Sequence, residues 1–329
     1  MTVALLSMSH SPLLEHVDPG PETTAAVTEA FDTARSFVHD YDPDLIVNFG
    51  PDHYNGFFYE LMPTFCIGYD AVSIGDYGSQ AGPLNVPGQV AKELASFVLD
   101  AGLDTAVSLR MEVDHGAVQP LELMYGDIAA KPVIPIFLNC VAPPFSPVKR
   151  IRLFGEAVGR FFGQKESTQK ESTQKESTQS DQKALFIASG GLSHDPPVPR
   201  IATATPEQRE FLLGGGRHLT PAARDERQQR VIDAARAFAA GEADIKDLAP
   251  DWDRALMDIL ASGDLTPLDA WTPDWMTEVA GNSSHEVRTW IAAYAALGAV
   301  GEYKVNYSFY RPIREYIAGF GVTTATLTG

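Results

Sequence analysis

The chain has 329 residues, 44% of them hydrophobic, and a formal net charge of -18. This length and apolar content allow a large core, whereas the acidity argues against a broad basic surface for nucleic acid or anionic lipid. The two cysteines, Cys66 and Cys140, form no C-x-x-C pair, so neither a disulfide framework nor a cysteine zinc site is supported.

The first half of the chain alternates apolar runs with helical segments. Val3–Ser7 and Leu45–Phe49 predict buried strands on either side of a helix over Pro21–His39. The remaining predicted elements here are helices at 90–99, 121–125 and 148–162 and strands at 105–113, 133–138 and 184–188. Strands joined by helices indicate an α/β layer.

The character changes after about residue 205, where the predicted elements are helices at 206–213, 222–240, 252–262 and 284–300. The tail at 307–320 is aromatic, and we expect it to be irregular. No clear linker divides the chain. The sequence therefore predicts one α/β domain over 1–329, with a central sheet, flanking crossover helices and a helical C-terminal part.

One segment consists of three copies of Lys-Glu-Ser-Thr-Gln at 165–179. It contains no apolar residue and cannot bury a face, so we predict a disordered insertion over 165–180. The absence of a basic leader before Val3 and of any apolar stretch of membrane-spanning length predicts a cytoplasmic protein without membrane contact.

Four histidines follow predicted strands: His10, His53, His115 and His194. Because open α/β sheets bind ligands at the carboxyl ends of their strands, we expect these imidazoles to converge on one site. Histidine serves there either as a metal ligand or as an acid or base near neutral pH. Four imidazoles exceed what one catalytic metal usually takes, so the two roles are expected to be divided among them.

Acidic residues near these histidines are candidate ligands or groups that orient an imidazole. Asp52, Asp114 and Asp195 adjoin histidines, and Glu286 begins a predicted helix. The spacing of Ser283 and Glu286 is that of a helix capping box, and spacing alone favours this cap over a metal ligand.

The residues leave the metal and the reaction open. Two histidines and one carboxylate on one face are the expected ligands of a non-haem iron(II) site. The same ligands could hold zinc and activate water in a hydrolase or amidase. A non-catalytic binding protein on the same scaffold is a third interpretation.

Several motifs together resemble the class III extradiol dioxygenases. They are Ser-His-Ser-Pro around His10, Pro-Asp-His-Tyr-Asn-Gly-Phe-Phe-Tyr around His53, Val-Asp-His-Gly around His115 and Gly-Gly-Leu-Ser-His ending at His194. The likeness extends through Tyr-Arg-Pro-Ile and Ile-Ala-Gly-Phe-Gly near the end of the chain. Only the repeat insertion departs from the family pattern.

The resemblance implies roles that spacing cannot assign. His10, His53 and Glu286 match the family's Fe(2+) ligands, which overrides the capping preference. His115 matches its proton donor and His194 its proton acceptor. No organic cofactor is implied.

The resemblance also implies a substrate class and an assembly. The substrates are O2 and the catechols 3-(2,3-dihydroxyphenyl)propionate and 2,3-dihydroxycinnamate, cleaved beside their hydroxyls in aromatic catabolism, by a protein that forms homo-oligomers. The side-chain carboxylate of such a substrate needs a polar or basic partner, because burying an unpaired charge is costly. Arg288, Arg311 and Arg314 are candidates between which the sequence does not choose.

Overall fold

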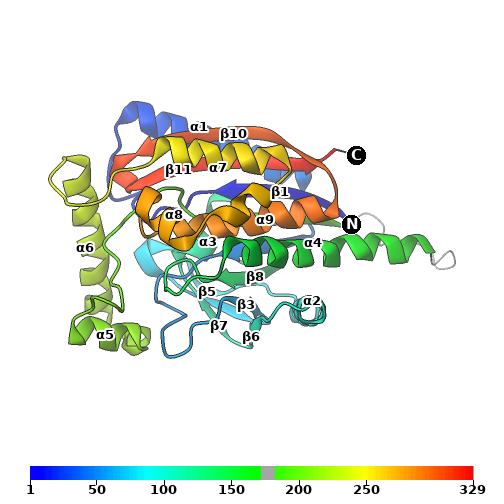
Figure 1. The fold of residues 1–329 in the computed structure, drawn as a ribbon, viewed down its shortest axis with the longest axis horizontal. Helices are drawn as coiled ribbons and strands as arrows, with labels where there is room; N and C mark the ends of the chain where they lie inside the picture. The colour runs from blue at the N-terminus through cyan, green and yellow to red at the C-terminus, as the bar shows by residue number, and fades with distance from the viewer. Residues whose placement is uncertain (172–181, 329) are drawn as a thin grey trace.

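The computed structural model describes residues 1–171 and 182–328, and its largest element is an eight-stranded mixed sheet (Figure 1). Four strands at its centre run parallel: β1 (Thr2–Met8), β9 (Lys183–Ser189), β2 (Leu45–Gly50) and β8 (Val133–Leu138). They are buried along almost their whole length, as expected for parallel strands covered on both faces. The predicted α/β class is confirmed.

Antiparallel strands complete both edges of this sheet. β11 (Ala318–Leu327) pairs with β1, and β10 (Tyr303–Ile313) pairs with β11. The expectation of an irregular tail at 307–320 is therefore wrong. Along β10 half-buried and exposed residues alternate, the pattern of an edge strand with one solvated face. At the opposite edge, β3 (Phe65–Gly68) pairs with β8, and β6 (Ala106–Ser108) pairs with β3.

A second, three-stranded sheet has the order β5-β4-β7, formed by Ala81–Pro83, Ala71–Ile74 and Met111–Val113. The strand predicted over 105–113 is thus two strands, because β6 joins the large sheet and β7 joins the small one. β7 leads directly into α3 (His115–Tyr125) and so fixes where that helix begins.

Helices cover both faces of the large sheet. On one face α9 (Val287–Val300) packs on β1, β9 and β2, and α4 (Val148–Glu171) packs on α9. α2 (Gly88–Asp100) packs in turn on α4. On the other face lie α1 (Pro21–Tyr41) and α3. Figure 1 shows the resulting layers.

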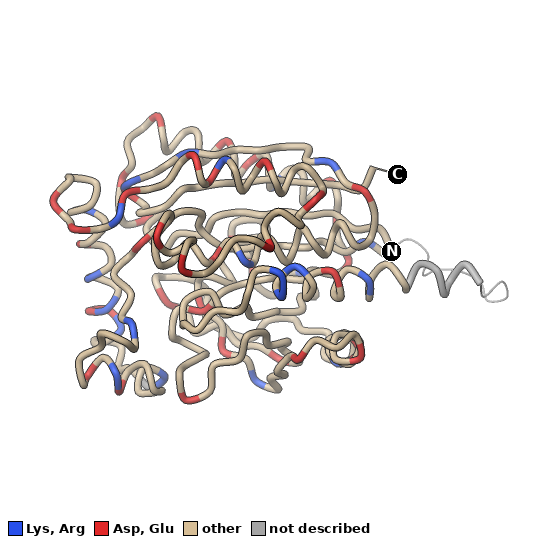
Figure 2. Tube along the Cα trace, in the orientation of Figure 1, with Lys and Arg blue, Asp and Glu red and all other residues tan. Residues whose placement is uncertain are grey.

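The helices predicted after residue 205 are confirmed as α5 (Pro206–Leu212), α6 (Pro221–Ala239), α7 (Pro250–Ser262) and α9, and α8 (Pro273–Ala280) is added to them. α5 and α6 form an arm at one end of the sheet (Figure 1). Figure 2 shows basic residues recurring along this arm, although acidic residues predominate in the chain as a whole.

The predicted insertion at 165–180 is only partly described. α4 continues through its first residues to Glu171, whereas residues 172–181 lie outside the described residues, so the disordered insertion stays a prediction. None of the helices in the described parts of the chain has the length and apolar content needed to cross a membrane.

Candidate active site

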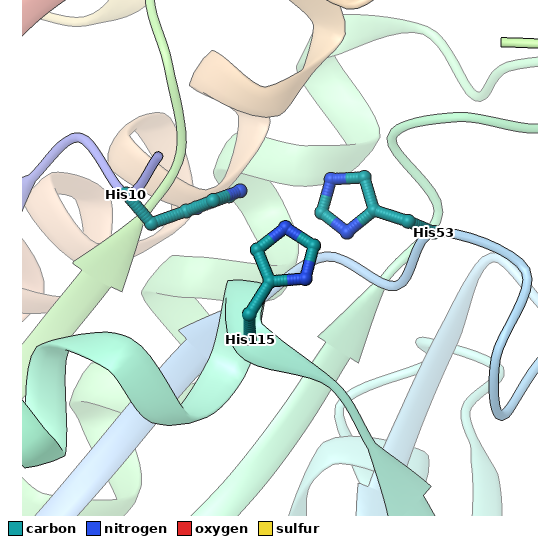
Figure 3. Close-up of side chains that lie close together, drawn as sticks. All are labelled: His10, His53 and His115. Atoms are coloured by element: carbon teal, nitrogen blue, oxygen red, sulfur yellow. The ribbon is translucent and has the colours of Figure 1, made fainter. Parts of the chain in front are cut away.

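The four predicted histidines lie together at the carboxyl edge of the sheet. His10, His53 and His194 follow the parallel strands β1, β2 and β9, while His115 is the first residue of α3. Figure 3 shows the rings of His10, His53 and His115 turned toward one another. Their ring centroids are 5.3 Å, 5.3 Å and 4.6 Å apart, and their nearest nitrogens lie within 4.8 Å of one another.

Glu286 lies among these imidazoles, with its side chain 2% exposed. Its Oε1 is 3.1 Å from Nε2 of His53 and 3.1 Å from Nε2 of His194. Its Oε2 is 3.5 Å from Nε2 of His10 and accepts a hydrogen bond from the Gly191 amide. The capping box is not formed, because no side chain caps the turn Ser284–Glu286.

Hydrogen bonds on the far side of two rings fix their tautomers. Nδ1 of His53 donates to the Asp114 carboxylate at 3.1 Å, and Nδ1 of His194 donates to the Leu192 carbonyl at 2.9 Å. In the neutral rings Nε2 then presents a lone pair to Glu286. A lone pair facing a carboxylate oxygen at 3.1 Å is repulsive unless a cation, either a proton or a metal ion, lies between them.

The electrostatics of the cluster favour a negative carboxylate. Burial alone would raise the pKa of Glu286, but the imidazoles of His194 and His10 hold it well below its usual range. Burial lowers the pKa of His10 to about 3, even though the Glu286 charge opposes this shift. Burial would also lower the pKa of His53, but Asp114 and Glu286 raise it well above its ordinary value. The site therefore combines an anionic donor with a neutral imidazole at neutral pH.

The donor set fits a divalent metal ion. Ligand atoms bound next to each other on one ion at about 2.1 Å lie roughly 3 Å apart. The separations between Glu286 and the Nε2 atoms of His10 and His53, 3.5 Å and 3.1 Å, are of this size. Two imidazoles and one carboxylate on one side of a cavity leave the other side open for further ligands.

The two predicted orienting acids differ in what they contact. Asp114 accepts from both the amide and Nδ1 of His53 and caps α3 by accepting from the Gly116 amide. It thus connects the loop of His53 to the helix that carries His115. Asp52 instead accepts from the amides at residues 55–57, so it shapes the loop and touches no imidazole by hydrogen bond.

The sequence interpretation missed Asp76. Its Oδ2 is 2.6 Å from Nδ1 of His115, and its Oδ1 accepts from the amide of the same residue. Asp76 lies in a short 3-10 turn, Asp76–Gly78, that follows β4. No local motif connects it with His115, which lies 39 residues further along the chain.

None of the three arginines proposed from the sequence lines the cavity at this site. Arg288 is buried and donates to the Ser146 carbonyl, Arg311 pairs with Glu22, and Arg314 pairs with Asp247. The cavity is lined instead by other arginines: Arg200, Arg227 and Arg230. Arg227 and Arg230 lie on one helix, α6. Their spacing in the sequence could not be interpreted, because it does not show where that helix lies relative to the histidines.

Curated proteins from several bacteria are similar to this chain over nearly its full length. A "2,3-dihydroxyphenylpropionate/2,3-dihydroxicinnamic acid 1,2-dioxygenase" from Rhodococcus globerulus is 61% identical, with 99% of each chain covered. Proteins of the same name from Rhodococcus rhodochrous and Mycolicibacterium smegmatis are 58% and 48% identical, covering 100% and 99% of this chain and 99% of each relative.

The family comparison gives a concordant result. Residues 4–321 match the family described as the catalytic LigB subunit of aromatic ring-opening dioxygenase. This range includes the four histidines and Glu286, and such a family implies a metal cofactor, a catechol substrate and O2. The chain belongs to the LigB family of aromatic ring-opening dioxygenases.

Proposed function

We propose that this chain is an iron(II)-dependent extradiol dioxygenase acting on 3-(2,3-dihydroxyphenyl)propionate and 2,3-dihydroxycinnamate in aromatic catabolism. The observation that carries the proposal is the convergence of His10, His53 and Glu286 in a chain whose relatives bear this activity in their names. The ring opens between the carbon bearing the side chain and the adjacent hydroxyl carbon. Both oxygen atoms would enter the product, which would be of the 2-hydroxy-6-oxonona-2,4-dienedioate type.

His10, His53 and Glu286 would hold the iron. The Asp114 carboxylate keeps the proton of His53 on Nδ1, so that Nε2 is available as a ligand atom. When bound, iron(II) would bring the catechol and O2 together at one centre and would carry electrons from the catechol to O2. Zinc suits the same ligands but has no accessible redox change.

His194 is the proposed proton acceptor. Its Nδ1 is held by the Leu192 carbonyl, which leaves Nε2 directed into the cavity beside Glu286. A catechol hydroxyl that loses its proton on binding can pass it to this nitrogen. His194 is 8% exposed, so few water molecules compete for that position.

His115 is the proposed proton donor. The Asp76 carboxylate accepts from Nδ1, which fixes the orientation of the ring and keeps a proton on that nitrogen. The other nitrogen lies on the cavity side, and the ring stacks on His53 at 4.6 Å. In this position it can deliver a proton to oxygen as the ring opens.

We further propose that the chain acts as one catalytic domain in a cytoplasmic homo-oligomer. The family resemblance supports the assembly, and the low cysteine content supports a reducing compartment.

The test is oxygen consumption by protein reconstituted anaerobically with iron(II) or, in parallel, with zinc. With 3-(2,3-dihydroxyphenyl)propionate, the iron protein is expected to form one yellow product molecule for each O2 consumed, and the zinc protein none. If iron is bound but no catechol leads to O2 uptake, the proposal is wrong. Hydrolysis of esters or amides by the zinc protein alone would favour the hydrolase.

A further inference from the structure

A cavity of about 980 Å³ connects the histidine cluster with α6. Its lining includes the four site histidines and Glu286, but also Arg200, Arg227 and Arg230. Figure 2 shows that basic residues recur on this part of an otherwise acidic chain. Positive side chains on a cavity that reaches a catechol site suggest that the ligand carries a negative charge at some distance from its ring.

Arg227 is held against the loop that carries His53. Its Nη2 donates to the His53 carbonyl, its Nη1 donates to Oδ1 of Asn55 at 3.2 Å, and its guanidinium lies 4.9 Å from the ring centroid of Phe211. The side chain is half-buried. These contacts fix the position of the guanidinium relative to a proposed iron ligand.

The partners of Arg227 are all neutral. Among the described residues, no carboxylate lies within ion-pair distance of its guanidinium, although acids outnumber bases in the chain by 43 to 25. Two of its five N–H groups are engaged, which leaves donors for another acceptor. A half-buried cation without a counter-ion is stabilised when an anion binds beside it.

The other two arginines on the cavity are already compensated. Arg230 pairs with Glu226 at 3.0 Å, and its side chain is 65% exposed. Arg200 lies 3.9 Å from Asp195, and its side chain is 47% exposed. Each therefore gains less than Arg227 from a new anionic partner, because solvent and an acid already stabilise the charge.

We propose that Arg227 binds the side-chain carboxylate of the catechol substrate. This inference rests on the proposed function, since it presumes a catechol at the histidine cluster. A guanidinium pairs with a carboxylate through two parallel hydrogen bonds, which fixes the direction of the acid as well as its charge. Arg227 also donates to the His53 carbonyl, so its position relative to this proposed iron ligand is fixed. A carboxylate bound to Arg227 therefore orients the catechol ring of the substrate relative to the proposed iron ligands.

One consequence is that the site should select against catechols that lack a side-chain carboxylate. A neutral 3-alkylcatechol would occupy the cavity and leave the guanidinium without its anion. Sites built to bind a polar group discriminate strongly against ligands that lack it. Arg227 is accordingly a specificity-determining residue, and the proton-transfer groups are not expected to depend on it.

The experiment compares 3-(2,3-dihydroxyphenyl)propionate with neutral 3-propylcatechol for the wild-type protein, Arg227→Met and Arg236→Met. Arg236 is the matched control, because it lies on the same helix and pairs with Asp233 but does not line the cavity. In Arg227→Met, kcat/KM for the acid is expected to fall roughly 10- to 100-fold, mainly through KM. The kcat/KM for 3-propylcatechol should stay within about 3-fold of the wild-type value, because this substrate has no carboxylate for Arg227 to bind. A change of that size is smaller than the effect of losing one charged hydrogen bond. Arg236→Met should change neither.

Iron content and thermal unfolding are measured on every variant. Equal losses with both substrates, or a loss of iron, would mean that Arg227 only supports the His53 loop and would overturn the inference. No loss with the acid would overturn it as well. If Arg227→Met does not fold, Arg227→Lys decides, because lysine keeps the charge but not the paired geometry and should raise KM for the acid alone. A wild-type protein inactive on both substrates would instead refute the proposed function.

Discussion

Glu286 illustrates at the scale of one residue how a buried charge identifies a site. Its two oxygens face three imidazoles and one amide within 3.5 Å, and no arginine or lysine forms an ion pair with it among the described residues. A buried carboxylate without such a partner is costly unless protons or a metal ion neutralise it. The arrangement is therefore the one expected of a metal ligand, which is the role proposed for Glu286.

Glu286→Gln is expected to reduce iron(II) affinity by more than about 100-fold, beyond the range typical of groups that only orient a ligand. The loss follows because the neutral amide is a poor ligand, although it can still accept from the Gly191 amide. Iron per protein chain, measured after anaerobic reconstitution, tests this. Ser283→Ala is the control: it should retain iron and change the unfolding free energy by less than about 1 kcal/mol, the usual cost of a lost cap. If Glu286→Gln retained iron and Ser283→Ala lost stability, the capping-box interpretation would be favoured instead.

Asp76 contacts Nδ1 and the amide of His115, so in the proposed mechanism it is a positioning residue that acts through that imidazole. Asp76→Ala is expected to lower kcat by about 10- to 100-fold, because the ring of His115 loses the partner of Nδ1. KM and iron content should change little, and Asp76→Asn should restore part of the rate because its carbonyl can still accept from Nδ1. Steady-state kinetics with an iron assay separate the cases. A parallel loss of iron would place Asp76 in the support of the metal ligands instead.

At the scale of elements, the contact between α4 and α9 sets the position of Glu286, which immediately precedes α9. Gly155 and Gly159 face the carbonyls of Ala292 and Ala296 so closely that an added Cβ would collide with them. The two helices can approach this far only because α4 has no side chain at these positions.

Gly159→Ala is expected to lower the unfolding free energy by about 1–3 kcal/mol, the usual cost of overpacking, and to weaken iron binding as α9 shifts. Gly163→Ala on the same helix should stabilise the protein by up to about 1 kcal/mol, because its Cβ would meet nothing closer than Val300 Cα at 3.8 Å and alanine favours helix. Denaturant titration of both variants provides the test. Equal effects would show that close packing at Gly159 does not matter.

Asp253 joins α7 to the loop of His194 and to β10. Its carboxylate accepts from the amide and hydroxyl of Ser193 and from the Tyr310 hydroxyl. Burial raises its pKa above the usual 3.8, although these hydrogen bonds oppose the shift. A raised pKa means that the folded state binds the proton more tightly than the unfolded state. The resulting stabilisation is present below about pH 4 and is lost as the pH rises through the folded pKa.

Asp253→Asn removes this titration, because it replaces the carboxyl group with an uncharged amide of similar shape. Its unfolding free energy relative to wild type is therefore expected to increase as the pH rises from about 4 toward 7. Chemical denaturation at several pH values measures the difference. A difference that is flat or falls with pH would contradict the assigned direction.

For the whole molecule, the central sheet was predictable because β1, β2 and β9 are short, largely apolar runs separated by helical segments. The hairpin β10–β11 was missed because Tyr303–Ile313 is an edge strand whose outer face is polar, so it does not read as core. Strands of three or four residues, such as β3 and β4, give too short a pattern to detect.

The site was predictable in part, for a related reason. Strand ends predict that the histidines converge, since parallel strands share one edge. Glu286 lies 233 residues from His53, and only the family resemblance connected them. Asp76 carried no local signal, and the arginine spacing around Arg227 could not be interpreted, because their roles arise from the small sheet and from the placement of α6, neither of which local pattern specifies.

Extradiol cleavage is tested most directly by the product formed under isotopically heavy oxygen gas. Iron-loaded protein and 3-(2,3-dihydroxyphenyl)propionate are mixed anaerobically, heavy oxygen is admitted, and the product is analysed by mass spectrometry and NMR. We expect a dienedioate opened beside the diol, with one heavy oxygen in the new carboxylate and a second in the new ketone, less any exchanged with water. A product opened between the two hydroxyls, or one without heavy oxygen, would contradict the account.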